Sequence, residues 1–167
     1  LIGNWRLSTE STIPTGGQQQ VVSRREKQNF PNYTLPPSGN LTTCQQDPSL
    51  AEALLREGSR LGVRVIAGQP ELANKDATYR AEHGRLGTIA LKQRPMSPAV
   101  LCMLISHEFI HVLQHLHGNL KGVDSLGWQT TPEGIQRFGS IQEAEAYRYQ
   151  NRAGHVIHLL RQTPIPQ

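Results

Sequence analysis

The regular spacing of apolar residues begins in the middle of the chain. After Asp47 and Pro48, leucines and alanines recur at helical intervals as far as Leu61, and Gly62 follows them. Aspartate is a favoured N-cap and proline suits the first helical turn, whereas glycine commonly follows the last turn. The pattern predicts a helix that Asp47 caps and that runs to Leu61.

The longest apolar segment predicts a buried helix. Ser97 provides an N-cap, Pro98 suits the first turn, and residues 99–117 continue without a break until Gly118. Apolar side chains occupy almost every side of this segment, which is typical of a helix at the centre of a core. We therefore expect residues 97–117 to form the central helix of the domain.

Short alternating segments between these helices predict a small sheet. Residues 63–67 alternate in polarity, and residues 78–82 and 88–92 could pair as a hairpin across 83–87. A connection rich in glycine and polar residues follows at 119–139. Ser140 then opens a final predicted helix that runs to Arg161, with Gly154 as its weak point.

The first part of the chain has a different composition. Residues 1–43 are rich in Gly, Pro, Gln, Ser and Thr, which disfavours regular structure. We interpret residues 1–43 as an extended arm and residues 44–167 as one α+β domain, a size that suits a single core. The arm could lie in a cleft of the domain as an inhibitory segment.

Charge and hydropathy narrow the classes of partner. The chain has 17 Lys and Arg against 13 Asp and Glu, but these basic residues are scattered, which argues against a nucleic-acid interface. The longest apolar run, residues 99–105, is far shorter than the roughly 18 residues of a membrane span. We expect no membrane span, and the oligomeric state stays open.

Two cysteines exclude some frameworks and leave others open. Cys44 and Cys102 are too few for a disulfide-rich scaffold or a thiolate zinc site with paired spacing, and a single disulfide between them stays open. Within the predicted buried helix, Cys102 is interpreted as a small core residue. The compartment stays unknown. Because the chain begins with Leu1 rather than Met, we slightly prefer an exported protein.

A HExxH motif lies inside the predicted central helix. His107 and His111 are four residues apart, so both imidazoles lie on one helix face about 40° apart and can reach one metal ion. Glu108 is placed to act as a general base in zinc-dependent hydrolysis. Burying these three polar residues in an apolar helix is costly unless a cation satisfies them. His115 lies one turn further on and is interpreted as an exposed residue, with a role beside the metal as the alternative.

A catalytic zinc site needs a third protein ligand, and three residues are candidates. The segment from Ser140 to Tyr147 resembles the glutamate helix of the gluzincin metallopeptidases, which implies Glu143 as the ligand. Ser140 and Glu143 also fit a capping box, in which case Glu145 would be the ligand instead. His117 has the spacing of the metzincin motif HExxHxxGxxH, but Gln114 stands in place of its glycine and no methionine follows.

The resemblance to the gluzincins implies a fold and an activity. We expect a zincin-like α+β domain in which a small mixed sheet packs on the HExxH helix and a glutamate helix follows. In such enzymes a sheet strand beside the HExxH helix binds an extended peptide, and we expect residues 88–92 to form it. An oxyanion-stabilising residue is also implied, with these candidates: Tyr147, Tyr149, His155 and His158. Tyr147 occupies the place of an acidic or amide residue in several such families.

The sequence therefore predicts a zinc-dependent metallopeptidase acting on a peptide or protein. Zn²⁺ would be bound by His107, His111 and Glu143, with Glu108 as general base and Tyr147 as the expected second catalytic residue. The alternative is a catalytically inactive member of the same scaffold that binds a protein or an anionic partner.

Overall fold

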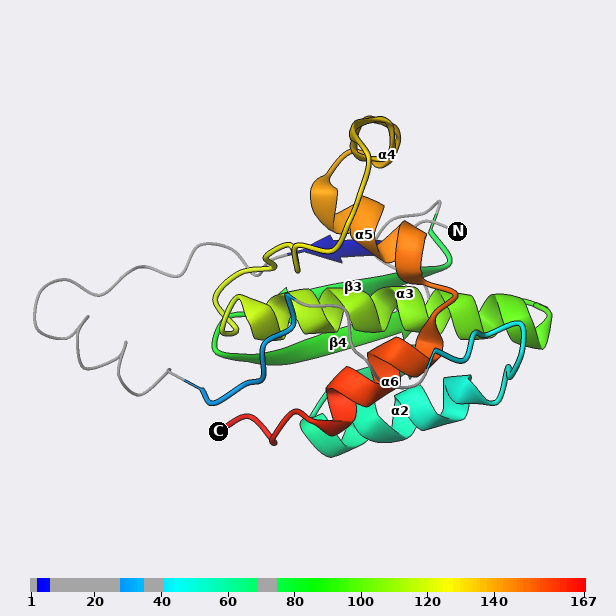
Figure 1. Cartoon of the computed structure of the whole chain (residues 1–167). Coiled ribbons are helices and arrows are strands. Elements are labelled where there is room, and N and C mark those ends of the chain that lie inside the picture. The colour runs from blue at the N-terminus through cyan, green and yellow to red at the C-terminus, as the bar shows by residue number, and fades with distance from the viewer. Residues whose placement is uncertain (1–2, 7–27, 35–40, 69–74) are drawn as a thin grey trace, which may run out of the picture.

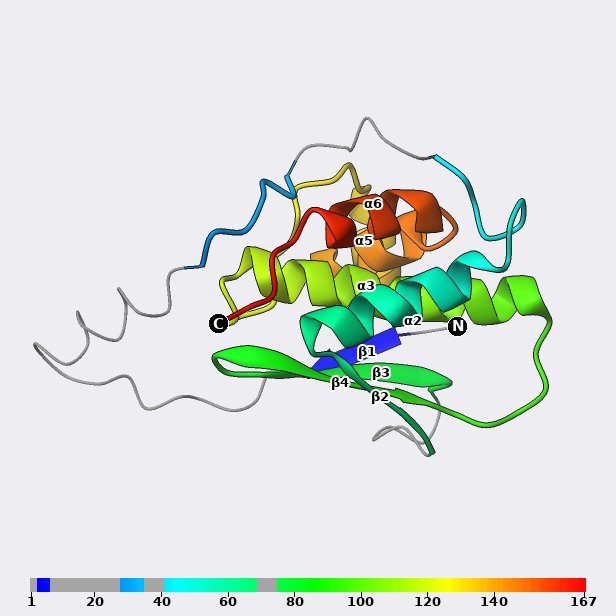
Figure 2. The same ribbon diagram turned by 90° about the horizontal axis from the view of Figure 1, so that it is seen from below.

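A small mixed sheet lies against layers of helices in the computed structural model, which describes residues 3–6, 28–34, 41–68 and 75–167 (Figures 1 and 2). The helices cover one face of the sheet, with α2 and α3 next to it and α5 and α6 beyond α3. The fold is thus α+β, as expected. The strands are β1 (Gly3–Arg6), β2 (Arg64–Ala67), β3 (Ala77–Glu82) and β4 (Arg85–Leu91). The helices are α2 (Leu50–Leu61), α3 (Pro98–His117), α4 (Pro132–Phe138), α5 (Ile141–Tyr149) and α6 (Ala153–Arg161).

The strand order is β1-β3-β4-β2. The predicted hairpin is confirmed as the antiparallel pair β3 and β4, although its turn is shorter than expected because only His83 and Gly84 separate the strands. Gly84 has a φ of +83°, a conformation that glycine adopts without strain. The predicted strand at 63–67 is β2, which pairs in parallel with β4.

The expectation that residues 88–92 form the peptide-binding strand is wrong. They belong largely to β4, which is flanked by β3 on one side and β2 on the other. Both sides of β4 are therefore used in the sheet, so this strand offers no edge to another chain. The alternating pattern at 88–92 predicted a strand but could not give its position in the sheet.

Helix α3 is the central helix, as its composition predicted. The Ser97 hydroxyl accepts a hydrogen bond from the Val100 amide, and Gly118 follows the last turn. Nearly all side chains from Cys102 to Leu116 are buried. The length and apolarity of α3 would also suit a membrane span, but 78% of the segment concerned is buried within the protein, as in the core helix of a globular domain.

Helix α2 packs closely on α3 through a glycine. A Cβ atom added at Gly58 would lie 2.4 Å from the Phe109 ring, which is fully buried. The predicted helix at 47–61 is thus confirmed from Leu50, and Ser49 rather than Asp47 is the N-cap residue. The Asp47 carboxylate still accepts the Ser49 amide proton at 3.1 Å, so it orders the approach to the helix.

The prediction of a single final helix over 140–161 is wrong, because two helices, α5 and α6, form there with a break between Tyr149 and Ala153. The break lies before Gly154, the predicted weak point. Backbone groups at the break bond to an earlier segment instead of continuing the helix: the Cys44 amide donates to the Asn151 carbonyl, and the Gly154 amide donates to the Thr42 carbonyl. These long-range bonds compensate for the interrupted helix.

Helix α4 lies in the polar connection at 119–139, for which no helix was predicted. Its start and end signals are ordinary: the Thr131 hydroxyl accepts from the Gly134 amide, Pro132 is in the first turn, and Gly139 ends the helix at a φ of +90°. The segment is short and has no buried residue, so it lacks the apolar periodicity that would have predicted it.

Part of the predicted arm contributes to the core. Most of residues 1–43 lie outside the described residues, but Tyr33 is fully buried. Its hydroxyl is hydrogen-bonded to the Thr163 hydroxyl, and its carbonyl accepts from the Trp128 indole at 2.8 Å. Burial raises the pKa of Tyr33 to about 12, against the opposing effect of the Thr163 hydrogen bond.

A disulfide joins Cys44 to Cys102 in α3, with Cα atoms 5.6 Å apart. This resolves the alternative that the sequence left open. Cys102 is buried as expected of a core residue, but it is also covalently linked. The bond holds the segment before α2 against the central helix, next to the break between α5 and α6.

We predict that replacing both cysteines by alanine lowers the free energy of unfolding by about 4 kcal/mol, because the bond closes a loop of 58 residues. Urea unfolding of the wild-type protein and the double variant would measure the difference. Reduced wild-type protein should behave like the variant. Equal unfolding midpoints for oxidised and reduced protein would contradict the prediction.

Candidate metal centre

Two neighbouring helices bring three potential metal ligands together. His107 and His111 lie on α3, and Glu143 lies in the first turn of α5. The Nε2 atoms of both histidines are 3.0 Å from Oε1 of Glu143. All three ligand atoms lie within 4.8 Å of one another, and all three residues are buried. The group formed by His107, His111 and Glu143 is called the HHE group below.

The outer nitrogen of each imidazole has a partner of its own. His107 Nδ1 lies 2.9 Å from the amide oxygen of Gln150, and His111 Nδ1 lies 2.8 Å from the amide oxygen of Gln114. An amide oxygen only accepts hydrogen bonds, so both Nδ1 atoms carry protons. In a neutral imidazole the proton on Nδ1 leaves a lone pair on Nε2, which here faces Glu143.

The orientation of Gln114 follows from two hydrogen bonds that its amide nitrogen donates. Its amide nitrogen donates to Glu145 Oε1 at 2.9 Å and to the Gln142 carbonyl at 3.0 Å. These two acceptors require the NH₂ group on their side, so the amide oxygen must face His111. Glu145 thereby fixes the tautomer of His111 through Gln114, an arrangement typical of metal-ligating histidines.

Burial and mutual contacts shift the pKa values of His107 and Glu143 in the HHE group. Burial lowers the pKa of His107, despite the opposing effect of its hydrogen bond with Glu143. Burial alone would raise the pKa of Glu143, but its bonds with His107 and His111 prevail and lower it to about 2. An ionised carboxylate oxygen therefore lies 3.0 Å from two imidazole nitrogens, a contact that needs a proton or a cation between the atoms. One metal ion bound by all three residues would meet that need.

The geometry fits a metal ion as well as the charge does. Ligand bonds of 2.0–2.2 Å in a tetrahedral arrangement place ligand atoms about 3.3–3.6 Å apart. The two separations of 3.0 Å between imidazole nitrogen and carboxylate oxygen are a few tenths of an ångström shorter. The HHE group could thus hold a metal ion with small adjustments of its side chains.

The structure shows one of the two hydrogen bonds of the predicted capping box at Ser140 and Glu143. The Ser140 hydroxyl accepts from the Glu143 amide at 3.1 Å, so Ser140 does cap α5. The Glu143 carboxylate, however, faces the two imidazoles. Helix capping therefore places Glu143 in the first turn while its carboxylate stays available to the HHE group.

The alternative third ligands lie elsewhere. The Glu145 carboxylate accepts hydrogen bonds from the backbone amides of residues 126–128 and from Gln114, so its oxygens are directed away from the imidazoles. His117 packs edge-on against the Tyr33 ring at 6.5 Å. Neither belongs to the HHE group.

His115 is buried, so its interpretation as an exposed residue is wrong. Its Nδ1 atom is 2.8 Å from the Tyr79 hydroxyl, which also accepts from the Gly87 amide. Burial lowers the pKa of His115 to about 4. His115 thus links α3 to β3 and β4 one turn beyond the HHE group, and it is neutral at pH 7.

Glu108 is fully buried, and neither of its carboxylate oxygens has a hydrogen-bond partner among the described residues. Burial raises its pKa well above the usual value, and the negative charge of Glu143 adds to the effect. The Tyr79 backbone opposes this rise, although it makes no hydrogen bond of normal geometry with either oxygen. An unpartnered buried carboxyl with a raised pKa suits a group that accepts and returns a proton.

Tyr147 lies beside the HHE group on α5. Its ring packs edge-on against His107 at 4.6 Å and stacks on Phe138 at 4.1 Å. The hydroxyl is buried and has no hydrogen-bond partner among the described residues. Burial, followed by the charges of Glu143 and Glu108, raises its pKa. It is therefore a protonated donor at neutral pH. A cavity of about 270 Å³ adjoins it, lined by Thr130, Thr131, Gly134, Phe138, Ala144, Tyr147 and Arg148.

The other residues considered for oxyanion stabilisation have different surroundings. The Tyr149 hydroxyl donates to the Gln129 carbonyl at 3.1 Å. His155 and His158 lie on α6, which carries no member of the HHE group. Of the four candidates, Tyr147 alone combines a ring contact to His107 with a buried hydroxyl that lacks a partner.

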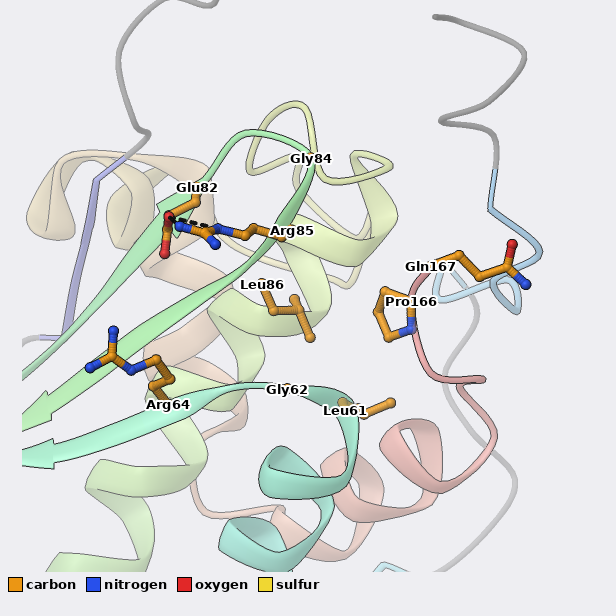
Figure 3. Close-up of a pocket in the computed structure, with 9 residues that line it drawn as sticks. All are labelled: Leu61, Gly62, Arg64, Glu82, Gly84, Arg85, Leu86, Pro166 and Gln167. Carbon is orange, nitrogen blue, oxygen red and sulfur yellow. Dashed lines mark hydrogen bonds and ion pairs between the residues drawn. The ribbon is translucent and has the colours of Figure 1, made fainter.

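A further hollow of about 230 Å³ lies at the turn between β3 and β4, next to the last residues of the chain (Figure 3). Arg85 points toward Glu82 there and forms an ion pair with it at 2.6 Å. None of the residues that line this hollow belongs to the HHE group.

Sequence reasoning missed the residues that orient the ligands. In the sequence, Gln114 shows itself only as a departure from the metzincin glycine, and Gln150 matches no motif. A glutamine three residues after a ligand histidine is a weak signal on its own, because its partner Glu145 lies on another helix. Gln114 contacts Glu145 across 31 residues of sequence, and Gln150 contacts His107 across 43 residues.

Comparisons with protein-family models, curated proteins and solved structures find no match to this chain. The HHE group is compatible with a zincin, and that likeness rests on the residues and geometry described above.

We predict that the protein binds one divalent metal ion per chain and that Glu143→Ala abolishes this binding, because the carboxylate supplies the only negative charge of the HHE group. Elemental analysis after dialysis against zinc would measure the content. The His117→Ala variant is the matched control and should retain the metal. Loss of metal from His117→Ala but not from Glu143→Ala would contradict the assignment.

The Glu145→Gln substitution should weaken metal affinity by about 10–100-fold, as expected for a residue that orients a ligand through Gln114. Titration against a chelator of known affinity would measure this. Glu133→Gln on α4 is a control. An unchanged affinity for Glu145→Gln would show that the bond to Gln114 does not orient His111.

Proposed function

We propose that the chain is a zinc-dependent metallopeptidase, with His107, His111 and Glu143 as the metal ligands. The observation that carries this proposal is the position of Glu108. Its carboxylate is buried and has no hydrogen-bond partner among the described residues. Glu108 follows the ligand His107 directly in sequence, and the charge of Glu143 helps to raise its pKa. A bound zinc ion would supply a Lewis acid that polarises a peptide carbonyl and lowers the pKa of a water molecule.

Glu108 is the proposed general base and then the general acid. It takes a proton from the attacking water as the water oxygen forms its bond to the carbonyl carbon. It then returns that proton to the amide nitrogen as the carbon–nitrogen bond breaks. The raised pKa of Glu108 favours the second half of this cycle, in which the carboxylic acid must be the donor.

Tyr147 is the proposed oxyanion-stabilising residue. Its hydroxyl is protonated at neutral pH and has no partner among the described residues, so it can donate to the oxygen on which charge develops. Its ring stacks on Phe138 and meets His107 edge-on, and these two contacts hold the ring in place without using the hydroxyl.

The substrate class proposed is an extended peptide or protein. The cavity beside Tyr147 is large enough for a substrate side chain, and Ala144 and Phe138 give its wall an apolar part. We also propose an exported location, which the disulfide between Cys44 and Cys102 supports because such bonds persist in oxidising compartments.

We predict that Glu108→Gln lowers kcat for peptide hydrolysis by about 10²–10⁴-fold while the protein keeps its zinc, because the amide cannot accept the proton. A quenched fluorescent peptide library would report cleavage. Tyr147→Phe should lower kcat by about 10²-fold through loss of one donor. Tyr149→Phe removes a hydroxyl that is already bonded elsewhere and should leave kcat unchanged.

Several results would count against the proposal. If the zinc-loaded wild-type protein cleaves no peptide in the library, the alternative of a non-catalytic scaffold that binds a protein or an anionic partner gains support. If Glu108→Gln cleaves as fast as the wild-type protein, the general base has been assigned to the wrong residue.

A further inference from the structure

Strand β1 lies at the edge of the sheet next to the helices that carry the HHE group. Among the strands of the described residues it pairs with β3 alone, in parallel, over the four residues Gly3–Arg6. Its other neighbours are α3 and α5, which supply the metal ligands (Figure 1). The opposite edge strand, β2, packs beside α2, which carries no member of the HHE group.

The pairing register places β1 beside a part of β3 that contacts α3. Trp5 is the register partner of Tyr79. Tyr79 also contacts α3, because its hydroxyl lies 2.8 Å from Nδ1 of His115. A segment paired at this register therefore runs along the part of the sheet that contacts the HExxH helix α3.

We propose that the edge of β3 is a docking edge for an extended peptide and that the protein's own residues 3–6 occupy it in cis. An incoming peptide would have to displace β1 before it could lie beside the HHE group. This inference rests on the proposed function for its catalytic consequence, since the substrate of a peptidase would use the same edge.

Backbone pairing explains how such an edge can accept different occupants. Strand addition uses main-chain hydrogen bonds, which any extended peptide can supply, so the segment in cis and a peptide in trans compete for the same donors and acceptors. A ladder of four residues forms few such bonds, and parallel pairing is slightly weaker per residue than antiparallel pairing. The occupant is thus held weakly enough to exchange.

The geometry of a parallel ladder suggests a specific disruption. Alternate residues of β1 direct their amides toward β3, so one of any two adjacent residues must donate to it. The double variant Asn4→Pro with Trp5→Pro removes that donor whichever residue carries it. The double variant Asn4→Ala with Trp5→Ala is the matched control, because it removes the same side chains and keeps both amides.

The test measures binding of a fluorescein-labelled peptide with the sequence of residues 1–8 to the full-length chain by fluorescence anisotropy. Glu108→Gln is present in every protein, which prevents turnover. We expect the proline variant to bind the peptide at least tenfold more tightly than the alanine variant. The ratio of the two dissociation constants reports how strongly residues 3–6 compete in cis.

Hydrogen exchange provides a second readout that needs neither zinc nor activity. The amides of Ala77–Glu82 that face β1 should exchange faster in the proline variant, and the added peptide should restore their protection. With Glu108 intact, the proline substitutions should lower the KM for a peptide substrate by a similar factor and leave kcat nearly unchanged.

The outcomes separate this inference from the proposed function. Tight peptide binding by the proline variant without any cleavage would support the docking edge and count against the peptidase. Cleavage by the wild-type protein with no gain in peptide binding or KM in the proline variant would overturn the docking edge alone. A proline variant that loses thermal stability and gains no peptide binding would show that β1 is a fixed structural strand, which also overturns the inference.

Discussion

The convergence of three hydrogen-bond acceptors in the core is the constraint on which the rest of the site depends. A buried carboxylate between two imidazole lone pairs is unfavourable unless a proton or a metal ion lies among them. The Nδ1 partners Gln114 and Gln150 direct the lone pairs inward, and Glu145 holds Gln114 in place. The protein thus keeps an arrangement that a cation would stabilise.

The fold provides this arrangement with rigid elements. Helix α3 is buried along most of its length and carries both histidines on one face. The Ser140 cap sets the start of α5 and so the position of Glu143. The disulfide at Cys102 and the backbone bonds at the break between α5 and α6 join the helices to the segment before α2. Few of the supporting contacts are local in sequence.

That distribution explains which features the sequence could predict. The extent of α3 followed from Ser97, Gly118 and the apolar run between them, and the pair of histidines followed from helical spacing. The break after Tyr149 did not, because it depends on hydrogen bonds to Thr42 and Cys44, about a hundred residues earlier. Helix boundaries set by local caps are readable from sequence, whereas those set by tertiary bonds are not.

The candidate site shows the same division. Glu143 could be proposed from its place in a capped helix after HExxH, yet the capping box offered an equally local alternative for its carboxylate. Only the packing of α5 on α3 distinguishes the two. The order of strands in the sheet likewise determines the central position of β4 and the burial of His115 against Tyr79. Residue alternation does not encode this order.

Zinc binding by the HHE group can be tested directly with an anomalous difference map from crystals of the zinc-loaded protein, recorded at the zinc absorption edge. We expect one strong peak about 2.0–2.2 Å from His107 Nε2, His111 Nε2 and a Glu143 oxygen, with both Nδ1 atoms still bonded to their glutamines. A peak at other residues, or none at the HHE group, would contradict it.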